Sequence, residues 1–206
     1  MFDPETLTLL AITDDLRDGR DGLVARAVAA VRGGATMIQL RLKDADARLQ
    51  VEVARALMAA LPPHVPLIVN DRADIALAAG AAGVHVGAED LPVDAMRRIA
   101  PADFIVGASV GCDAEVEGAR GADYVGIGPV YGTPSKSDAG AAIGVEEFAR
   151  LARRTGVPAV AIGGVDASNA APLIAAGARG VAVIRAVFGA EEPESAARAI
   201  RSAIGR

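Results

Sequence analysis

The sequence has few of the side chains on which nucleophilic and zinc chemistry usually depend. Its 206 residues include one cysteine, Cys112, and only two histidines, His64 and His85. A single cysteine excludes an intramolecular disulfide, and no cluster of Cys and His has the spacing of a zinc site. Because no histidine lies near Cys112 in the sequence, we interpret that residue as a small side chain and not as a nucleophile.

Aromatic residues, basic runs and long apolar runs are also scarce. Aromatic residues make up 3% of the chain and the formal net charge is −5, a balance that argues against nucleic acid as a partner. No apolar run approaches the roughly 18 to 20 residues that cross a bilayer, and the N-terminus lacks the pattern of a signal peptide. We therefore expect one soluble, cytoplasmic domain over 1–206, with no membrane partner, as a monomer or a small homo-oligomer.

The chain does contain a regular alternation of short β-branched runs and Ala-rich segments. The apolar runs are continuous, as expected for parallel strands that are covered on both faces. Eight such runs occur, at 8–13, 36–41, 67–70, 83–86, 104–109, 124–128, 159–163 and 180–184. Segments with helical spacing follow them, at 23–34, 48–61, 73–80, 92–100, 114–121, 145–156, 167–177 and 194–204. Eight units of nearly even length predict an α/β fold, the (β/α)₈ or TIM barrel.

The active site of such a barrel lies at the carboxyl ends of its strands. The residues at these ends are almost all polar or glycine: Thr13, Asp14, Asp15, Gln39, Arg41, Lys43, Asn70, Asp71, Glu89, Asp90, Ser109, Gly128, Gly163, Gly164 and Arg185. Gln39, Arg41 and Lys43 alternate with two leucines and therefore share one face of a strand. An exposed edge strand would alternate in the same way, but a strand covered on both faces favours a ligand at these positions.

Two aspartates follow neighbouring apolar runs and are candidate metal ligands. Asp71 comes directly after the run at 67–70, and Asp90 lies shortly after the run at 83–86. Mg²⁺ commonly binds through one or two carboxylates, completed by water and substrate phosphate oxygens. Asp and Asn are also favoured helix N-caps, so capping is an equally good interpretation of Asp71 and an open one for Asp90.

The segment 126–144 is too polar and too rich in glycine for a strand or a helix, and we interpret it as a long binding loop. Its Thr133, Ser135 and Lys136 offer hydroxyl and ammonium donors to a phosphate. Gly163 and Gly164 lie where barrel enzymes bind phosphate through backbone N–H groups and a short helix. A mobile surface loop is the alternative interpretation of the long segment.

Neither histidine indicates nucleophilic catalysis, so we expect the chemistry to be electrostatic. His85 lies inside an apolar run, where it is either a general base or a hydrogen-bonded core residue, and we expect the second role. His64 is expected in an exposed loop. The sequence indicates no Ser-His-Asp or Cys-His arrangement and no close pair of carboxylates for glycoside hydrolysis.

Four segments together resemble the thiamine phosphate synthase/TenI superfamily over nearly the whole chain. They are MIQLRLKD, LIVNDRADIALAAGAAGVHVGAEDLP, GADYVGIGPVYGTPSKSDAG, and VPAVAIGGV with GARGVAVI. The resemblance implies a Mg²⁺-dependent transferase that joins 4-amino-2-methyl-5-(diphosphooxymethyl)pyrimidine to a thiazole phosphate, in its carboxylated or aromatic form. Pyrophosphate would leave from a cation-like pyrimidine methylene, and thiamine phosphate would form.

The same resemblance assigns roles to individual residues. It implies that the pyrimidine diphosphate is bound by Gln39, Arg41, Lys43, Asn70, Ser109 and Lys136. Of these, Arg41, Ser109 and Lys136 would act in catalysis, while Asp71 and Asp90 would hold Mg²⁺. The thiazole phosphate would be bound by Thr133, Ser135, Gly164, Ile184 and Arg185.

The chain departs from the family pattern in three places. Ala88 stands where the family usually has Gln, and Arg185 stands where a Ser normally follows the eighth strand. Gly111 and Cys112 lie in a stretch that is more often polar in members of the family. The rival interpretations are a TenI-like thiazole tautomerase and a non-catalytic phosphate-ligand sensor. Tautomerases often lack the metal-binding Asp and carry a His where this chain has Pro129, so Asp71 and Pro129 favour the synthase.

Overall fold

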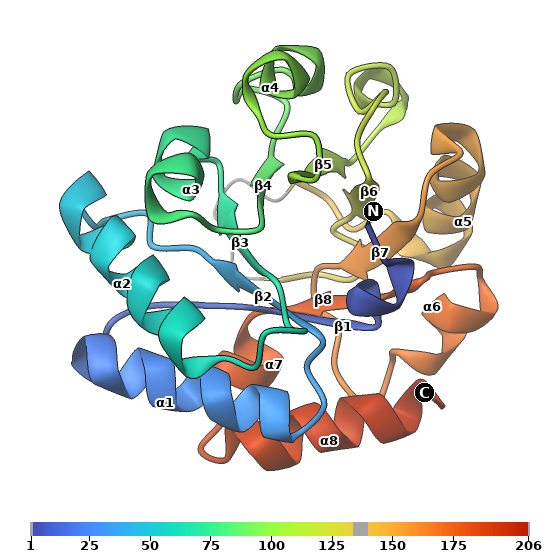
Figure 1. The fold of residues 1–206 in the computed structure, drawn as a ribbon. Coiled ribbons are helices and arrows are strands. Elements are labelled where there is room, and N and C mark those ends of the chain that lie inside the picture. Colours follow the sequence, from blue (N-terminus) through green and yellow to red (C-terminus); the bar gives the residue numbers. More distant parts are fainter. Residues whose placement is uncertain (1, 134–139, 206) are drawn as a thin grey trace.

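The computed structural model describes residues 2–133 and 140–205, and its strands form a closed, all-parallel barrel (Figure 1). The strands are β1 (Leu9–Ile12), β2 (Met37–Leu40), β3 (Leu67–Asn70), β4 (Gly83–Val86), β5 (Ile105–Val110), β6 (Tyr124–Ile127), β7 (Ala159–Ile162) and β8 (Gly180–Val183). The barrel closes because β1 pairs with both β2 and β8. The predicted TIM-barrel fold is confirmed, and each strand coincides with a predicted apolar run to within one residue.

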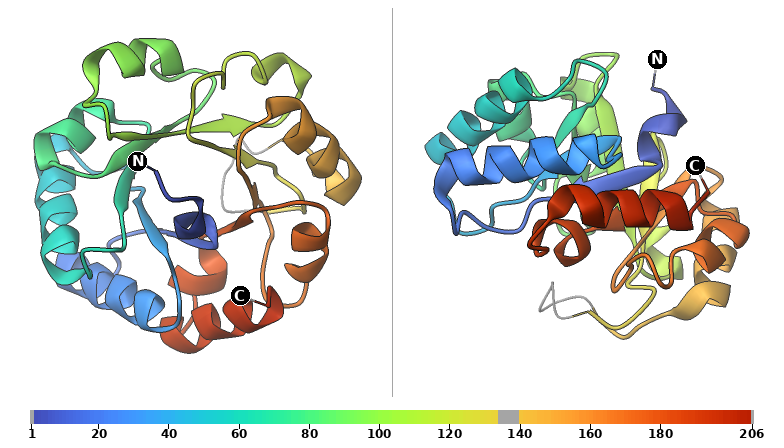
Figure 2. Two further views of the ribbon diagram at one scale, coloured as in Figure 1. Left: turned by 45° about the vertical axis from the view of Figure 1, so that its right-hand side comes forward. Right: turned by 90° about the horizontal axis from the view of Figure 1, so that it is seen from below.

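Helices surround the barrel on its outer side (Figure 2). They are α1 (Gly19–Arg32), α2 (Ala47–Ala60), α3 (Ala73–Ala79), α4 (Val93–Ile99), α5 (Gly144–Thr155), α6 (Ala171–Ala175), α7 (Arg185–Phe188) and α8 (Pro193–Ala203). Within the described residues, no helix is long and apolar enough to cross a membrane.

The prediction of a helix over 114–121 is wrong. Residues 111–123 are all described, and they form only a short 3₁₀ helix, η2 (Asp113–Glu115), followed by turns. Gly118 and Gly121 lie within this stretch, and Gly121 has a left-handed φ of 88° that ends any helical run. Likewise, the loop predicted over 126–144 begins later than expected, because Gly126 and Ile127 pair with β7 as part of β6.

The amino end of the barrel is closed by the N-terminal segment. The 3₁₀ helix η1 (Pro4–Leu7) precedes β1, and Leu7 is fully buried among the inward-facing strand residues. The ring of Phe2 stacks on that of Tyr124, with 6.2 Å between the ring centroids. The described cavity lies at the opposite end, where the strands finish.

Side-chain alternation divides the buried residues into two clusters. Leu9 and Ala11 of β1 pack outward with the helices, whereas Leu10 and Ile12 point into the barrel. Inside the barrel, apolar residues such as Met37 and Tyr124 fill the amino half. This division follows from the two-residue period of a strand, which gives each strand one face toward the helices and one toward the barrel axis.

The carboxyl half of the interior is polar and has small residues at several positions. Register places Asn70 beside His85, and Ser109 beside Gly126. A Cβ atom on Gly126 would lie 3.2 Å from the His85 ring, and one on Gly107 would lie 2.3 Å from the ring of Tyr124. The Tyr124 ring therefore requires a glycine at position 107, and Gly126 leaves room for the His85 ring.

We predict that Gly107→Ala destabilises the fold by about 1 to 3 kcal/mol, because the added methyl overlaps the fully buried Tyr124 ring. Urea unfolding, followed by far-ultraviolet circular dichroism, measures the effect. Gly118→Ala is the matched control, since its Cβ would meet only a carbonyl oxygen at 3.6 Å. A Gly107→Ala protein with the stability of that control would contradict the close packing of Gly107 against the Tyr124 ring.

Candidate active site

A cavity of about 1080 Å³ opens at the carboxyl ends of the strands. Most of the candidate site residues line it: Arg41, Lys43, Asn70, Asp71, Asp90, Ser109, Thr133, Gly164, Ile184 and Arg185. Ser135 and Lys136 lie outside the described residues. A cavity of this size exceeds the usual range of about 300 to 1,000 Å³ for small-molecule sites, so it has room for two small substrates.

Among the described residues to which the family resemblance assigns a role, Gln39 is the one that does not line the cavity. It is buried at 3% exposure, and its side chain hydrogen-bonds Tyr124 in the barrel interior. A substrate in the cavity would not contact Gln39 directly. Gln39 is linked to the site through the buried side chains of the barrel interior.

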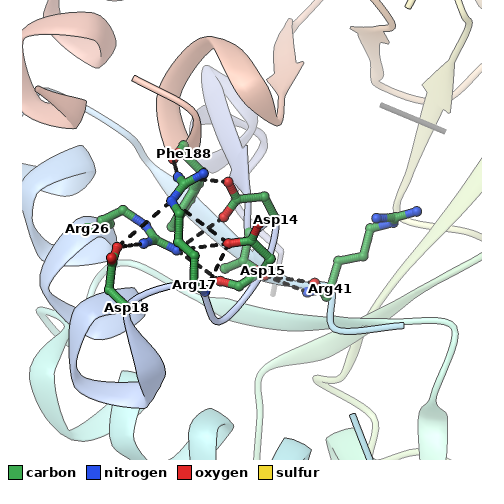
Figure 3. Close-up of polar contacts among 8 residues, drawn as sticks. Asp14, Asp15, Arg17, Asp18, Arg26, Arg41 and Phe188 are labelled. Carbon is green, nitrogen blue, oxygen red and sulfur yellow. Dashed lines mark hydrogen bonds and ion pairs between the residues drawn. The ribbon is translucent and has the colours of Figure 1, made fainter. Parts of the chain in front are cut away.

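Arg41 is held by its backbone, which leaves its side chain to face the barrel mouth. The Thr13 hydroxyl accepts a hydrogen bond from the Arg41 N–H at 2.8 Å and donates one to the Arg41 carbonyl at 3.1 Å. In Figure 3 the Arg41 side chain extends away from the neighbouring aspartates. Its Nε is buried and has no hydrogen-bond partner among the described residues, an arrangement that favours an acceptor ligand around the guanidinium group.

Asp14 and Asp15, which follow the first strand, do not line the cavity, so the expectation that they belong to the site is wrong. Asp14 accepts ion pairs from Arg17 at 2.9 Å and from Arg26 at 3.2 Å (Figure 3). Arg17 also donates a hydrogen bond to the carbonyl of Phe188 at the end of α7. This cluster joins the β1–α1 loop to α7 and is a support for the cavity wall.

Asp71 is placed by an unusual backbone conformation. Its φ is 63°, and it is the one described non-glycine residue with a positive φ. Left-handed backbone is uncommon outside glycine and tends to mark functional positions. The N-cap of α3 is Arg72, with no capping side chain, so the helix-capping interpretation of Asp71 does not hold.

Asp90 does not cap a helix either, because the N-cap of α4 is Pro92. Instead, its Oδ2 accepts the Gly87 N–H at 2.7 Å, and this bond closes the β4–α4 loop on itself. The carboxylate still lines the cavity, as does the exposed Glu89. Among the described residues there is no cluster of three or more protein ligands for a metal.

Charge is distributed unevenly around the described part of the cavity. Its carboxylates are Asp71, Glu89, Asp90, Glu115 and Asp166, and its cations are Arg41, Lys43 and Arg185. The first four carboxylates follow β3, β4 and β5, so that side of the cavity is acidic. An anionic group could bind there only with a cation between it and the carboxylates.

The opposite side is built from glycines and the start of a short helix. Gly163 and Gly164 have φ values of 96° and 64°, and a Cβ atom on Gly164 would lie 2.6 Å from the Gly132 carbonyl. The Asn169 side chain donates to the Gly164 carbonyl at 2.9 Å and fixes this turn. The first turn of α7 lines the same wall, and helix N-termini present free N–H groups to anions.

A chain of buried polar side chains leads from the barrel interior to the cavity. His85 Nδ1 lies 2.9 Å from the Tyr124 hydroxyl, and Nε2 lies 3.0 Å from the Ser109 Oγ. Burial raises the pKa of Tyr124, so the phenol stays protonated. The expectation that His85 is a hydrogen-bonded core residue is confirmed, although its partner Ser109 also lines the cavity. His64 is exposed, as expected.

Sequence reasoning missed two residues that hold the site in place. The sequence indicates for Thr13 only a position at the end of a strand, yet its side chain fixes the Arg41 backbone. Asn169 fixes Gly164, and a signal for it exists in the sequence. Asp166 and Asn169 are three residues apart, and the Asn169 side chain accepts the Asp166 N–H at 2.9 Å, as in a capping box.

Comparison with known proteins places this geometry in a family. The family model described as "Thiamine monophosphate synthase" matches residues 9–187. A thiamine-phosphate synthase from Roseiflexus sp. (strain RS-1) is 48% identical over 94% of this chain and 83% of its own length. One from Xanthobacter autotrophicus (strain ATCC BAA-1158 / Py2) is 46% identical over 98% of this chain and 97% of its own.

Solved structures agree with the sequence comparison. A thiamine phosphate pyrophosphorylase from Pyrococcus furiosus superposes with a TM-score of 0.88 at 38% identity, over 98% of this chain and 97% of that one. A phosphoribosyl anthranilate isomerase from Thermus thermophilus, at 17% identity and a TM-score of 0.69, shares the fold alone. By these matches, the chain belongs to the thiamine monophosphate synthase family.

Proposed function

We propose that the protein is a transferase that joins 4-amino-2-methyl-5-(diphosphooxymethyl)pyrimidine to a thiazole phosphate and releases pyrophosphate. Membership of the family supports the overall reaction, in which thiamine phosphate forms. The observation that carries the assignment to this cavity is its division into two unlike walls. One wall carries carboxylates and basic side chains, and the other is made of glycines and the start of α7.

The first wall suits the pyrimidine diphosphate. Arg41 and Lys43 at the end of β2 supply positive charge, and Asn70 and Ser109 add neutral polar groups on neighbouring strands. A guanidinium group can contact phosphate oxygens with two parallel N–H donors. Lys136 is proposed as a further cation on the departing pyrophosphate, from a segment outside the described residues.

Asp71 and Asp90 fit Mg²⁺ as carboxylate ligands on that wall. Two carboxylates at the cavity surface are what Mg²⁺ needs when phosphate oxygens and water complete its shell. Without a cation, the acidic side of the cavity would repel a diphosphate, which supports the metal assignment. When bound, the metal would neutralise charge on the leaving pyrophosphate.

The second wall suits the thiazole phosphate. Gly164 and the backbone at Ile184 and Arg185 would receive its phosphate, where a helix N-terminus favours an anion. Thr133 would contact the ring, and Ser135 is proposed beside it from outside the described residues. Arg185 is exposed and lines the cavity, so its guanidinium group can reach a phosphate held at this wall.

The reaction then needs alignment and charge stabilisation more than a protein nucleophile. The bond from the pyrimidine methylene to the diphosphate oxygen breaks, and the thiazole nitrogen forms a new bond to that carbon. Arg41 and Lys136 stabilise the negative charge that develops on the leaving group. Binding both substrates in one cavity supplies the proximity that such a bimolecular step requires.

The proposed function is tested by pyrophosphate release from the purified protein. We expect release only when the pyrimidine diphosphate, the thiazole phosphate and Mg²⁺ are all present. Single-substrate and chelator reactions are the controls. Binding of thiazole phosphate with no release would instead favour a tautomerase or a sensor, and a direct tautomerase assay would separate those two.

We predict that Asp71→Asn lowers kcat/KM by about 100-fold, because one of the two metal carboxylates loses its charge. Residue 71 has a left-handed backbone with a φ of 63°, which Asn adopts as Asp does. The substitution should therefore leave the conformation of the loop unchanged. Steady-state assays over a series of Mg²⁺ concentrations should show half-maximal activity shifted to higher concentration.

The control for Asp71→Asn is Asp103→Asn, an exposed position that does not line the cavity. It should leave both the rate and the Mg²⁺ dependence unchanged. Full activity of Asp71→Asn at the wild-type Mg²⁺ concentration would remove Asp71 from the metal site.

We predict that Arg185→Ser raises the KM for thiazole phosphate by about 3- to 10-fold, since an exposed guanidinium–phosphate contact is partly screened by water. The KM for the pyrimidine diphosphate should stay constant. Arg198→Ser on the outer helix α8 is the matched control. A KM for thiazole phosphate that is unchanged or lower would show that Arg185 does not bind this substrate.

A further inference from the structure

Three buried or half-buried side chains of neighbouring strands form one hydrogen-bonded chain in the barrel interior. Tyr124 on β6 is fully buried, His85 on β4 is 8% exposed, and Ser109 on β5 is the member that reaches the cavity. The His85 ring joins the other two, with Nδ1 at 2.9 Å from the Tyr124 hydroxyl and Nε2 at 3.0 Å from the Ser109 Oγ. The direction of donation along this chain decides what Ser109 offers to a ligand.

The contact between Tyr124 and His85 has a preferred direction. A phenol with an ordinary pKa of about 10 is a strong neutral donor, and an unprotonated imidazole nitrogen is a better acceptor than a phenol oxygen. Tyr124 therefore donates a hydrogen bond to Nδ1 and does not accept one from it. The Gln39 amide also hydrogen-bonds Tyr124, and it can donate to the phenol oxygen.

Once Nδ1 accepts, the rest of the chain is determined. A neutral imidazole carries one proton, so the proton must lie on Nε2, which then donates to the Ser109 Oγ. The Ser109 oxygen is thereby occupied as an acceptor on its inner side. Its own hydrogen is left to point toward the cavity. The opposite arrangement, with Nε2 as a base for a nucleophilic serine, would require Nδ1 to donate to the phenol.

We propose that His85 is held as the Nε2–H tautomer by Tyr124, and that this makes Ser109 a hydrogen-bond donor to the pyrimidine diphosphate. The identity of the ligand rests on the proposed function, whereas the tautomer rests on the interior contacts alone. His85 and Tyr124 are thus positioning residues that act through Ser109. A donor at this position suits an anionic substrate, and it is fixed before the substrate binds.

The geometry of the interior supports a positioning role. Gly126 leaves room for the His85 ring, since a Cβ atom there would lie 3.2 Å from its Cε1. Gly107 does the same for Tyr124. The rings of His85 and Tyr124 are 5.5 Å apart between centroids, so the two side chains pack against each other as well as sharing a hydrogen bond.

The tautomer can be measured without any turnover. In protein labelled with ¹⁵N at histidine, long-range ¹H–¹⁵N correlation spectra distinguish the protonated ring nitrogen from the unprotonated one. The chain has two histidines, and His64→Gln, at an exposed turn, assigns the signals of His85. We expect the proton on Nε2 in the wild type. A proton on Nδ1, or on both nitrogens, would overturn the proposal.

Kinetics then tests the consequence for Ser109. Tyr124→Phe keeps the ring but removes the donor to Nδ1, so kcat/KM for the pyrimidine diphosphate should fall about tenfold. The KM for thiazole phosphate should stay within about twofold, a split that a general loss of packing would not produce. His64→Gln should leave both constants unchanged. A Tyr124→Phe protein with wild-type kinetics and an unaltered His85 tautomer would refute the positioning role.

His85→Gln and His85→Leu complete the test. Glutamine can place a donor near the former Nε2, so it should retain several-fold more activity than leucine at equal thermal stability. Equal activity of the two variants would count against donation to Ser109. A wild-type protein with no turnover at all would refute the proposed function, and the spectra would still decide the tautomer.

Discussion

The closed barrel forces every second residue of each strand toward one shared axis, and the cavity depends on how that limited space is filled. The amino half is occupied by Leu10, Met37, Ile68 and Tyr124, and η1 closes it from below. Large residues there need small ones beside them, which explains the lack of a side chain at Gly107. Had the carboxyl half been filled in the same way, there would be no cavity. Polar and glycine residues at the strand ends therefore define the depth of the site.

The walls of the cavity are held by contacts that lie outside it. Thr13 fixes the backbone of Arg41, Asn169 fixes the carbonyl of Gly164, and Arg17 connects the β1–α1 loop to the end of α7. Thr13 and Arg17 belong to the segment between β1 and α1, whereas Asn169 lies between β7 and α6. Groups that bind a ligand must already be in place when it arrives if they are to favour the transition state, and such supports provide that order.

The sequence predicts the barrel well because parallel strands have a simple signature. Runs such as 67–70 and 83–86 are apolar, short and bounded, and the structure places β3 and β4 at these residues. The segment 114–121 has the apolar spacing of a helix but forms only a short 3₁₀ helix and turns, because Gly118 and Gly121 oppose a helix. Local spacing does not reveal which loops fold back on themselves, as Glu115 does when it accepts the Gly111 N–H at 2.6 Å.

The site was predicted in outline but not in its connections. Asp71, Asp90 and Ser109 were predicted from their position at strand ends, and they do line the cavity. Asp14 and Asp15 also follow a strand but do not line it, because they form ion pairs with Arg17 and Arg26. Which acidic residues remain available depends on whether the fold places a cation beside them, and strand-end position does not encode that.

The same limit applies to His85, whose partners are 24 and 39 residues away. Spacing along the sequence places it in a strand, but only register brings it between Tyr124 and Ser109. The absence of a sequence-local Ser-His pair therefore does not decide the chemistry. The direction of the hydrogen bonds does, because an imidazole that accepts from a buried phenol cannot also accept a proton from the serine. A serine and a histidine 3.0 Å apart are, in this setting, an arrangement for binding an anion and not for attack.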